Sequence, residues 1–413
     1  MYVSVRNAPV RLKGALSLKG VSTTVITLGW VSLVTDISSE MVTAVLPLFV
    51  MLELGLSPAA YGAIEAMYQA GSVIARVAGG YLGDVRAPKW VAAAGYAASA
   101  VCKLFLIFAT NFGALFAIVS FDRCGKGLRT APRDAMIAAA SHPDKLGRSF
   151  GVHRTMDTLG ALVGPLLAWF LLLFAEDDFV LVFLVSFCIA VAAVVLIAFL
   201  DPERVEDAQS ANTETAGFDL AAFKTALTDR RYLAIAIAYA VLSLSTVSDG
   251  FLYLILLRAD SGATAQFPLL FVGTSLAYLV FALPVGNIAD QLGRPRIFLM
   301  GYASLLAAYL ACGLLAGIPA MALGLLFLGL YYAATDGMLP AVATPLLPPH
   351  LRATGLSVLQ SVNAVGKATS AALFGLAWAY VGPARALWLF AAVLVIAILC
   401  VGALLRPGRP AGS

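Results

Sequence analysis

One stretch of this chain places four cationic side chains in a segment that is otherwise apolar. The stretch is FDRCGKGLRTAPRD, residues 121–134, and its cations are Arg123, Lys126, Arg129 and Arg133. In an α-helix each residue advances about 100° around the axis, so this spacing confines the four side chains to an arc of about 120°. Charges of this kind are costly against lipid, so the face contacts protein or water. Guanidinium and ammonium groups in such a row can bind a carboxylate or a phosphate.

Two carboxylates provide a second chemical feature. Asp36 and Glu40 stand four residues apart, one helical turn, near the middle of the apolar stretch 22–51. Acids inside apolar segments are rare and functional, and they can take up and release protons during a reaction or transport cycle. We predict that these two residues carry protons. The alternative is that Asp36 forms a permanent structural ion pair with Arg123 or Arg129.

Further polar residues occur in other apolar stretches. Gln360, Asn363 and Lys367 follow each other at intervals of three and four residues, so they share one helix face, which we expect to meet a central cavity. The alternative is a buried ion pair that fixes the helix in register. Together with the cations at 126, 129 and 133, the predicted substrate-binding residues are Asp157, Asp249, Asp336, Gln360, Asn363 and Lys367.

The elements that must position these groups are membrane-spanning helices. Hydrophobic residues make up 61% of the chain and charged residues only 12%, with a mean hydropathy of +0.90. A helix of about 20 apolar residues crosses a hydrocarbon layer of about 30 Å. Such stretches lie at 22–51, 59–82, 88–110, 113–137, 149–174, 178–200, 232–257, 266–289, 296–316, 319–343, 353–380 and 384–405. The sequence therefore predicts an all-α integral membrane protein with twelve transmembrane helices.

The second half of the chain repeats the first. Gly80-Tyr-Leu-Gly-Asp84 returns as Gly286-Asn-Ile-Ala-Asp290, and each copy is followed by a Gly-Tyr pair. A duplicated half written in apolar residues is typical of a transporter built from two helical bundles. We predict a bundle with a short cytosolic tail at 1–200, a polar cytosolic linker at 201–231, and a second bundle with a short cytosolic tail at 232–413.

The distribution of Lys and Arg predicts the orientation. With a cytoplasmic N-terminus, the inner loops and tails hold 17 Lys and Arg residues, and the outer loops hold only Arg258 and Arg385. Positive residues stay on the cytoplasmic side, so both termini are expected to be cytoplasmic in a multi-pass protein of the plasma membrane. The net charge of +4 reflects this topology, and no nucleic-acid partner is expected from it.

Other chemistries find no support in the residues. All five cysteines lie in apolar stretches, and the three histidines have no spacing suited to a metal. His153 and Asp157 are four residues apart, but His153 reads better as an interfacial residue than as a proton relay. No glycine-rich phosphate loop ending in Lys-Ser/Thr is present, so ATP is not expected as an energy source. We expect no enzyme activity, no metal and no cofactor, with the proton gradient as the energy source.

From about residue 20 to 405 the chain resembles the major facilitator superfamily. The signature of that family is a loop between the second and third spans, Gly-x-Leu-Ala-Asp-Arg-x-Gly-Arg-Lys. The second half matches it with Gly286, Asp290, Gly293 and Arg294. The first half keeps only Gly80, Asp84 and a terminal Lys89. The resemblance implies that these residues form cytoplasmic gate loops.

Two further motifs resemble the proton-coupled efflux branch of that family. Arg123-x-x-Lys126-Gly127 is similar to the Arg-x-x-Gln-Gly signature of its proton antiporters, with Lys in place of Gln. Gly160-x-x-x-Gly164-Pro165 is similar to a signature of its exporters, with Ala168 where that pattern has Gly. The first likeness implies a role for Arg123 in proton exchange, beside Asp36 and Glu40. Packing of small residues is the alternative for the second.

The resemblance implies the facilitator fold, with two pseudo-symmetric six-helix bundles around a site near the middle of the bilayer. We expect a secondary active transporter that exports a small organic solute in exchange for protons by alternating access. One alternative is proton-coupled uptake of a small organic anion. Another is a membrane sensor or assembly protein that keeps the fold without transporting. The expected partners are a small-molecule substrate, protons and the lipid bilayer, and a monomer suffices for the cycle.

Overall fold

The computed structural model describes residues 21–85, 87–142, 145–175, 178–200, 229–259, 264–336, 338–347 and 352–404. Throughout these ranges the regular structure is helical, and no strand occurs in them. Among the described residues, eight stretches are long and apolar enough to cross a membrane: Thr23–Glu53, Arg148–Phe174, Phe179–Ala198, Arg230–Leu257, Thr264–Leu292, Arg294–Leu314, Gly317–Thr335 and Pro383–Leu404. The prediction of an all-α integral membrane fold is confirmed.

The contacts along the chain divide it into two compact units. Unit 1 comprises Met1–Leu54 and Gly71–Thr215, and unit 2 comprises Gly55–Ala70 and Ala216–Ser413. Residues 55–70 lie in the first half of the sequence but pack with the helices of the second half. The tails at 1–20 and 405–413, and residues 201–228 of the predicted linker, lie outside the described residues.

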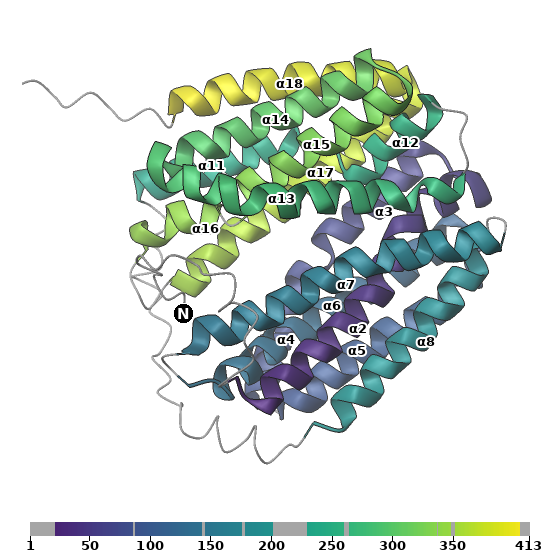
Figure 1. The fold of residues 1–413 in the computed structure, drawn as a ribbon, viewed down its shortest axis with the longest axis vertical. Helices are drawn as coiled ribbons and strands as arrows, with labels where there is room; N and C mark the ends of the chain where they lie inside the picture. Colours follow the sequence, from purple (N-terminus) through teal and green to yellow (C-terminus); the bar gives the residue numbers. More distant parts are fainter. Residues whose placement is uncertain are drawn as a thin grey trace, which may run out of the picture. The chain divides into compact units, whose positions relative to one another are not determined.

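Unit 1 is a bundle of long helices (Figure 1). They are α2 (Thr23–Leu48), which continues as the π-helical turn η1 (Phe49–Glu53), α4 (Ser72–Val85), α5 (Pro88–Leu106), α6 (Phe112–Ala139), α7 (Leu146–Phe174) and α8 (Phe179–Ala198). Within this unit α2 packs on α7 and α8, and α6 packs on α4 and α5. Side chains that accept backbone N–H groups begin α2, α6 and α8, namely Ser22, Asn111 and Asp178.

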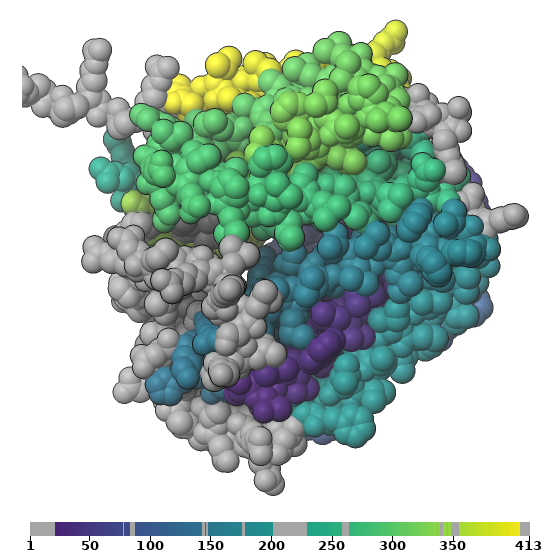
Figure 2. All heavy atoms as spheres, viewed as in Figure 1, coloured from purple at the N-terminus to yellow at the C-terminus, as the bar shows by residue number. Residues whose placement is uncertain are grey.

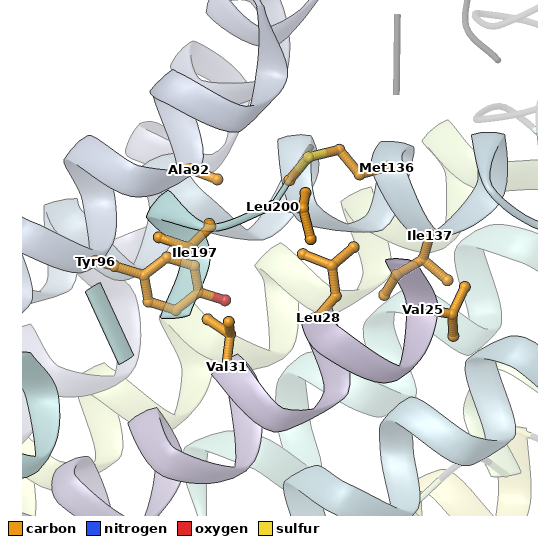
Figure 3. Close-up of a cluster of buried hydrophobic side chains, with 9 residues drawn as sticks. All are labelled: Val25, Leu28, Val31, Ala92, Tyr96, Met136, Ile137, Ile197 and Leu200. Carbon is orange, nitrogen blue, oxygen red and sulfur yellow. The ribbon is translucent and has the colours of Figure 1, made fainter. Parts of the chain in front are cut away.

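One end of unit 1 is held by an apolar cluster that Figure 3 shows. Its members come from four helices and the residues just after them: Val25, Leu28, Val31, Ala92, Tyr96, Met136, Ile137, Ile197 and Leu200. These side chains are almost completely buried. The cluster anchors α2, α5 and α6 to each other, and these are the helices that carry most of the charged groups of this unit.

The outer faces of both units are apolar, as a lipid environment requires. Phe174 of α7 is 72% exposed, and Val195 of α8 is 48% exposed. In α18 (Pro383–Leu404) of unit 2, Ile396 and Leu399 are more than half exposed. Figure 2 shows α7 and α8 in teal and α18 in yellow at the surface of their units. This is a multi-pass membrane protein.

Unit 2 contains the remaining helices. They are α3 (Pro58–Ala70), α11 (Arg230–Leu244), α12 (Asp249–Ala259), η3 (Thr264–Gln266), α13 (Pro268–Leu292), α14 (Arg294–Leu314), α15 (Gly317–Thr335), α16 (Met338–Ala343), η4 (Thr344–Leu346), α17 (Arg352–Val381) and α18. Helix α3 crosses α17 at two glycines. A Cβ atom on Gly62 would lie 2.6 Å from the carbonyl oxygen of Ala371, and one on Gly375 would lie 2.5 Å from that of Pro58. Only glycine permits so close a backbone approach.

Two predicted spans are interrupted in the structure. The span predicted at 59–82 consists of α3 and α4, separated by a turn at Gly71. The span predicted at 232–257 is broken between Leu244 and Asp249. Neighbouring side chains satisfy the freed backbone groups of the second break, which membrane proteins require. Their hydrogen bonds are Val247 N to Tyr309 Oη at 2.7 Å, Tyr309 Oη to Ser245 O at 3.0 Å, and Ser370 Oγ to Thr246 O at 2.7 Å.

Candidate functional site

Helices α2 and α6 bring acids and bases together inside unit 1. On α2, Ser32, Asp36 and Glu40 follow each other at intervals of four residues and so lie along one face. Arg133 of α6 donates from Nη1 to Ser32 Oγ at 3.1 Å. Because successive spans alternate in direction, α2 and α6 run oppositely, and residues before Arg133 lie beside residues after Ser32. This register sets the fourth-span cations opposite the two carboxylates.

The electrostatic neighbours of the two acids agree with this register. The cations that act on Asp36 are Lys126, Arg129 and Arg133, with Lys126 the strongest. Lys126 is also the strongest of the cations that act on Glu40. Both carboxyl groups and the ammonium group are half-buried. Lys126, which replaces the Gln of the antiporter-like motif, is therefore the cation that both acids share.

Arg123 has a different principal partner. Its Nε donates to Asp122 Oδ2 at 3.0 Å, and its Nη2 also contacts that oxygen. Asp122 accepts a further hydrogen bond from Ser99 Oγ, and Lys103 Nζ lies 3.8 Å from its Oδ1. Arg123 is 4% exposed and Lys103 is 3% exposed. The structure thus joins Arg123 to Asp122, its neighbour in sequence, in a buried network between α5 and α6.

Arg129 lies nearly buried on an aromatic ring. It is 3% exposed, and its guanidinium carbon lies 4.7 Å from the centroid of the Tyr96 ring. Its Nη1 has no hydrogen-bond partner among the described residues. Stacking on an aromatic face is favourable for a guanidinium but leaves its N–H groups available.

The exporter-like motif of α7 packs directly behind the two acids. A Cβ atom on Gly160 would lie 2.7 Å from Leu33 O and 2.9 Å from Asp36 Cβ. A Cβ atom on Gly164 would lie 2.6 Å from Ile37 O and 2.8 Å from Glu40 Cβ. Pro165 follows, buried, within the same helix. The two glycines let α7 and α2 touch at the turn that carries both carboxylates.

Two further predicted residues of unit 1 have local partners. Asp157 Oδ2 lies 3.5 Å from Nδ1 of the buried His153, one turn earlier on α7, while its Oδ1 has no hydrogen-bond partner in the described part of the chain. Arg133 Nη2 lies 2.9 Å from Asp134 Oδ1. Arg133 therefore both fixes the register of α2 and α6 and pairs with its own neighbour.

In unit 2 the predicted residues form a second polar cluster. Asp249 begins α12 directly after the break, and Tyr332 of α15 donates its hydroxyl to that carboxylate, with Oη 2.8 Å from Oδ1 and 2.9 Å from Oδ2. Lys367 Nζ lies 5.8 Å from the centroid of the Tyr332 ring. Asn363 lies on α17 with Lys367, and its buried Oδ1 accepts no hydrogen bond from any described residue. The structure brings Asp249 and Lys367 to the same tyrosine, Tyr332, while Asn363 lies one helical turn before Lys367 on α17.

Two other predicted residues of unit 2 are exposed. Gln360 lies on α17, and Asp336 follows the C-terminal end of α15. In this cluster the sequence did not predict Tyr332. Its hydroxyl binds Asp249, and its ring lies beneath the ammonium group of Lys367. A hydroxyl that faces a carboxylate on a separate helix leaves no spacing signal in a sequence.

The two copies of the gate loop differ. In the second copy Gly293 has a φ of +92°, which ends α13 and begins α14 without strain, as glycine allows. Arg294 Nη2 lies 3.2 Å from Asp290 Oδ1, and both side chains are exposed. A Cβ atom on Gly286 would contact nothing within 4 Å.

In the first copy the cation is buried. Lys89 is 4% exposed, and its ammonium group donates to the carbonyl oxygens of Ala198, at 2.9 Å, and Leu200 at the end of α8. Gly80 of α4 packs loosely near Ala131, 3.6 Å from the position of a Cβ atom. The side chain of Asp84 lies outside the described residues. Lys89 thus acts as a C-terminal cap for α8.

We expect Lys89→Met to destabilise unit 1. Methionine keeps the apolar stem but removes the ammonium, so the last carbonyl groups of α8 lose charged hydrogen bonds, which contribute about 1.5–3 kcal/mol each at most. The melting temperature in detergent should fall. Lys145→Met, at an exposed position, is the matched control. Equal melting temperatures for the two variants would contradict the capping role.

Comparisons with known proteins agree with the fold. The model of the Major Facilitator Superfamily matches residues 28–267 and 250–413. A curated relative, the uncharacterized MFS-type transporter MJ1317 of Methanocaldococcus jannaschii, is 28% identical over 359 residues, which cover 85% of this chain and 87% of the relative. The uncharacterized protein Rv2265 of Mycobacterium tuberculosis is 25% identical over 345 residues, 80% of each chain.

Solved structures show the same architecture at low sequence identity. The nucleoside transporter NupG superposes with a TM-score of 0.77 at 15% identity, covering 94% of this chain and 100% of that one. A POT family transporter in complex with 5-aminolevulinic acid superposes with a TM-score of 0.69 at 15% identity, covering 92% and 95%. At such identities the likeness concerns the fold alone.

Proposed function

This chain belongs to the Major Facilitator Superfamily and is a membrane transporter of that type, and we propose that it exports a small organic solute in exchange for protons. Membership in a transporter family indicates a carrier rather than an enzyme. Alternating access would follow from movement of two helical bundles around a site near the middle of the bilayer. We further propose that it acts in the plasma membrane with both termini cytoplasmic, in line with the distribution of Lys and Arg.

The observation that carries this proposal is the pair of half-buried carboxylates on α2. Asp36 and Glu40 face Lys126 on one side and contact the exporter-like glycines of α7 on the other. A proton on either carboxyl group neutralises it, and a positive group of the solute would do the same. Since the two cannot occupy one carboxylate together, arrival of the solute would release the proton, which is the requirement for antiport.

In antiporters of this family the arginine of the motif assists proton exchange. Here Arg123 and Lys126 would share that role. Lys126 is the strongest cationic neighbour of both acids, so it would be the positive charge that stands opposite them when they carry no proton. Arg123 acts on Glu40 from within its network with Asp122. The coupling group that we propose is therefore Asp36, Glu40, Lys126 and Arg123, with the first two as the proton carriers.

The second candidate function is proton-coupled uptake of an organic anion. Its specific support is Arg129, whose Nη1 has no hydrogen-bond partner among the described residues. In that function an anion on Arg129 or Lys126 would leave the carboxylates without a counter-ion, so they would bind protons together with the anion. Solute and proton would then move in the same direction.

The direction of the pH gradient that drives transport separates these functions. The full chain is reconstituted in liposomes, and proton flux is followed with a luminal pH dye on addition of amines, carboxylates or amino acids. Antiport predicts accumulation of solute when the lumen is acid, and a protonophore should abolish it. If the solute accumulates only when the outside is acid, solute and proton move in the same direction, and the proposal of export is replaced by proton-coupled uptake. Absence of solute-dependent flux in either direction would favour a non-transporting membrane protein.

A further inference from the structure

In the described part of unit 1, four charged side chains of the interior lack the close hydrogen bonds and ion pairs that the others make. Most of the interior charges in this unit have a close partner: Lys89 on carbonyl groups, Lys103 and Arg123 on Asp122, Arg133 on Asp134, and Asp157 beside His153. No hydrogen bond or ion pair within 4.0 Å joins the four others to any residue that the structure describes. We call them the open set: Asp36, Glu40, Lys126 and Arg129.

The open set lies on α2 and α6, and the guanidinium group of Arg129 rests on the ring of Tyr96 from α5. The hydrogen bond from Arg133 Nη1 to Ser32 Oγ, 3.1 Å long, fixes the register of the two helices. One and two turns further along α2 come Asp36 and Glu40, and one and two turns back along α6 come Arg129 and Lys126. The electrostatic neighbours of Asp36 include both of these cations. The two acids of α2 thus lie at the same levels of the bundle as the two bases of α6. We call this arrangement the row.

Tight glycine contacts keep the two sides of this row apart. Helix α2 rests on α7, where Gly160 and Gly164 touch the backbone at Leu33 and Ile37. On α6, a Cβ atom on Gly125 would lie 2.9 Å from Gly95 O of α5, and one on Gly127 would lie 2.7 Å from Ser72 O of α4. Each helix is packed against its neighbours through its backbone. The acids and bases therefore cannot simply close on each other by a shift of either helix.

A ligand with charge of one sign would leave half of the open set without a partner. Unpaired charges in a membrane interior are costly because the hydrocarbon cannot solvate them. A ligand that carries both an ammonium and a carboxylate satisfies both sides and leaves the net charge of the row unchanged. We propose, on the basis of the proposed function, that the transported solute is zwitterionic, with its ammonium on Asp36 and Glu40 and its carboxylate on Arg129 and Lys126.

The exchange needs no covalent chemistry. The ammonium donates N–H hydrogen bonds to the carboxylate oxygen that the proton occupied, and that proton leaves for the aqueous phase. At the other end the carboxylate of the solute accepts from Arg129 Nη1, the buried donor that has no partner among the described residues. One proton is exchanged for one neutral zwitterion, which agrees with antiport.

The test is a set of probes that share a carbon chain. Binding of γ-aminobutyrate, butyrate and butylammonium to the full detergent-purified chain is measured by calorimetry. Glycine and β-alanine, each with its matched anion and amine, extend the series to shorter chains. For at least one length we expect the zwitterion to bind at least about tenfold more tightly than either matched probe, since it makes charged hydrogen bonds at both ends.

Variants assign the two ends. Arg129→Gln should reduce the affinity for the zwitterion by about tenfold or more and leave that for the amine unchanged. Asp36→Asn should reduce the affinity for the zwitterion and leave that for the anion unchanged. Arg76→Gln and Glu53→Gln, at exposed positions of the same unit, are the matched controls and should change nothing. Thermal unfolding of each variant in the absence of ligand checks that it is folded.

The proposal is overturned if no zwitterion binds more tightly than its matched anion and amine, or if Arg129→Gln binds zwitterions as wild type does. Its failure is distinguishable from that of the proposed function. If a plain amine or a plain anion drives proton flux in liposomes and no zwitterion does, proton coupling is retained and the proposal of a zwitterionic solute is refuted. Tight binding of a zwitterion that neither drives proton flux nor depends on a pH gradient would keep the zwitterionic solute and remove proton coupling.

Discussion

Replacement of Asp36 by Asn, or of Glu40 by Gln, is expected to abolish transport driven by a pH gradient. The amides keep the shape of the side chains but cannot carry a proton, and both positions face Lys126 on α6. Exchange of solute against solute across the membrane does not require a proton to leave, so it should persist at least in part. The measurement is gradient-driven accumulation beside equilibrium exchange in the same proteoliposomes.

The control for this prediction is Glu53→Gln at the exposed end of η1, which should transport as wild type does. Full gradient-driven accumulation in both Asp36→Asn and Glu40→Gln would remove these residues from proton coupling. Loss in one variant only would assign the proton to that carboxyl group. A Lys126→Gln variant adds a check, because it removes the shared cation and should shift the pH dependence of transport rather than abolish it.

Gly164→Ala is expected to have the largest structural effect of any single methyl group added to α7. The new Cβ atom would lie 2.6 Å from Ile37 O and 2.8 Å from Glu40 Cβ, closer than real contacts allow. Backbone atoms cannot rotate away, so α7 must move from α2. Overpacking of this kind costs about 1–3 kcal/mol. We expect a lower melting temperature and loss of transport, because the turn that carries the acids is displaced.

Gly151→Ala on the same helix is the matched control, since a Cβ atom there would meet nothing within 4 Å. Alanine has a higher helix propensity than glycine by about 0.8–1.0 kcal/mol, so the control should be as stable as wild type or more so. Equal behaviour of Gly164→Ala and Gly151→Ala would show that α2 and α7 do not depend on this contact. The link between the glycine motif and the carboxylates would then be lost.

The charged stripe of α6 illustrates what spacing alone can predict. The helical phase of its four cations follows from about 3.6 residues per turn. The choice of partner does not, because adjacent residues on a helix point in different directions and Asp122 was not an obvious partner for Arg123. A long guanidinium side chain can fold back to its neighbour, and Lys103 and Ser99 of α5 complete that site. Contacts from another helix decided the outcome.

The interruptions of two spans show a similar limit. Hydropathy registers both 59–82 and 232–257 as continuous, because the residues at the breaks are apolar or small. The second break is stable because Tyr309 and Ser370, far away in sequence, supply hydrogen bonds to its backbone. No local signal in the sequence encodes such a partner. By contrast, the helical fold and the duplication were readable from composition and repeats.

The crossing of Gly62 and Gly375 has a consequence for the polypeptide as a whole. Helix α3 is encoded in the first half of the chain but completes unit 2 by packing on α17. A C-terminal fragment made separately would therefore lack one of its own helices, and an N-terminal fragment would carry α3 without α17, its main packing partner. Two fragments cut between the halves would each be incomplete, and complementation between them would depend on the first fragment donating α3 to the second.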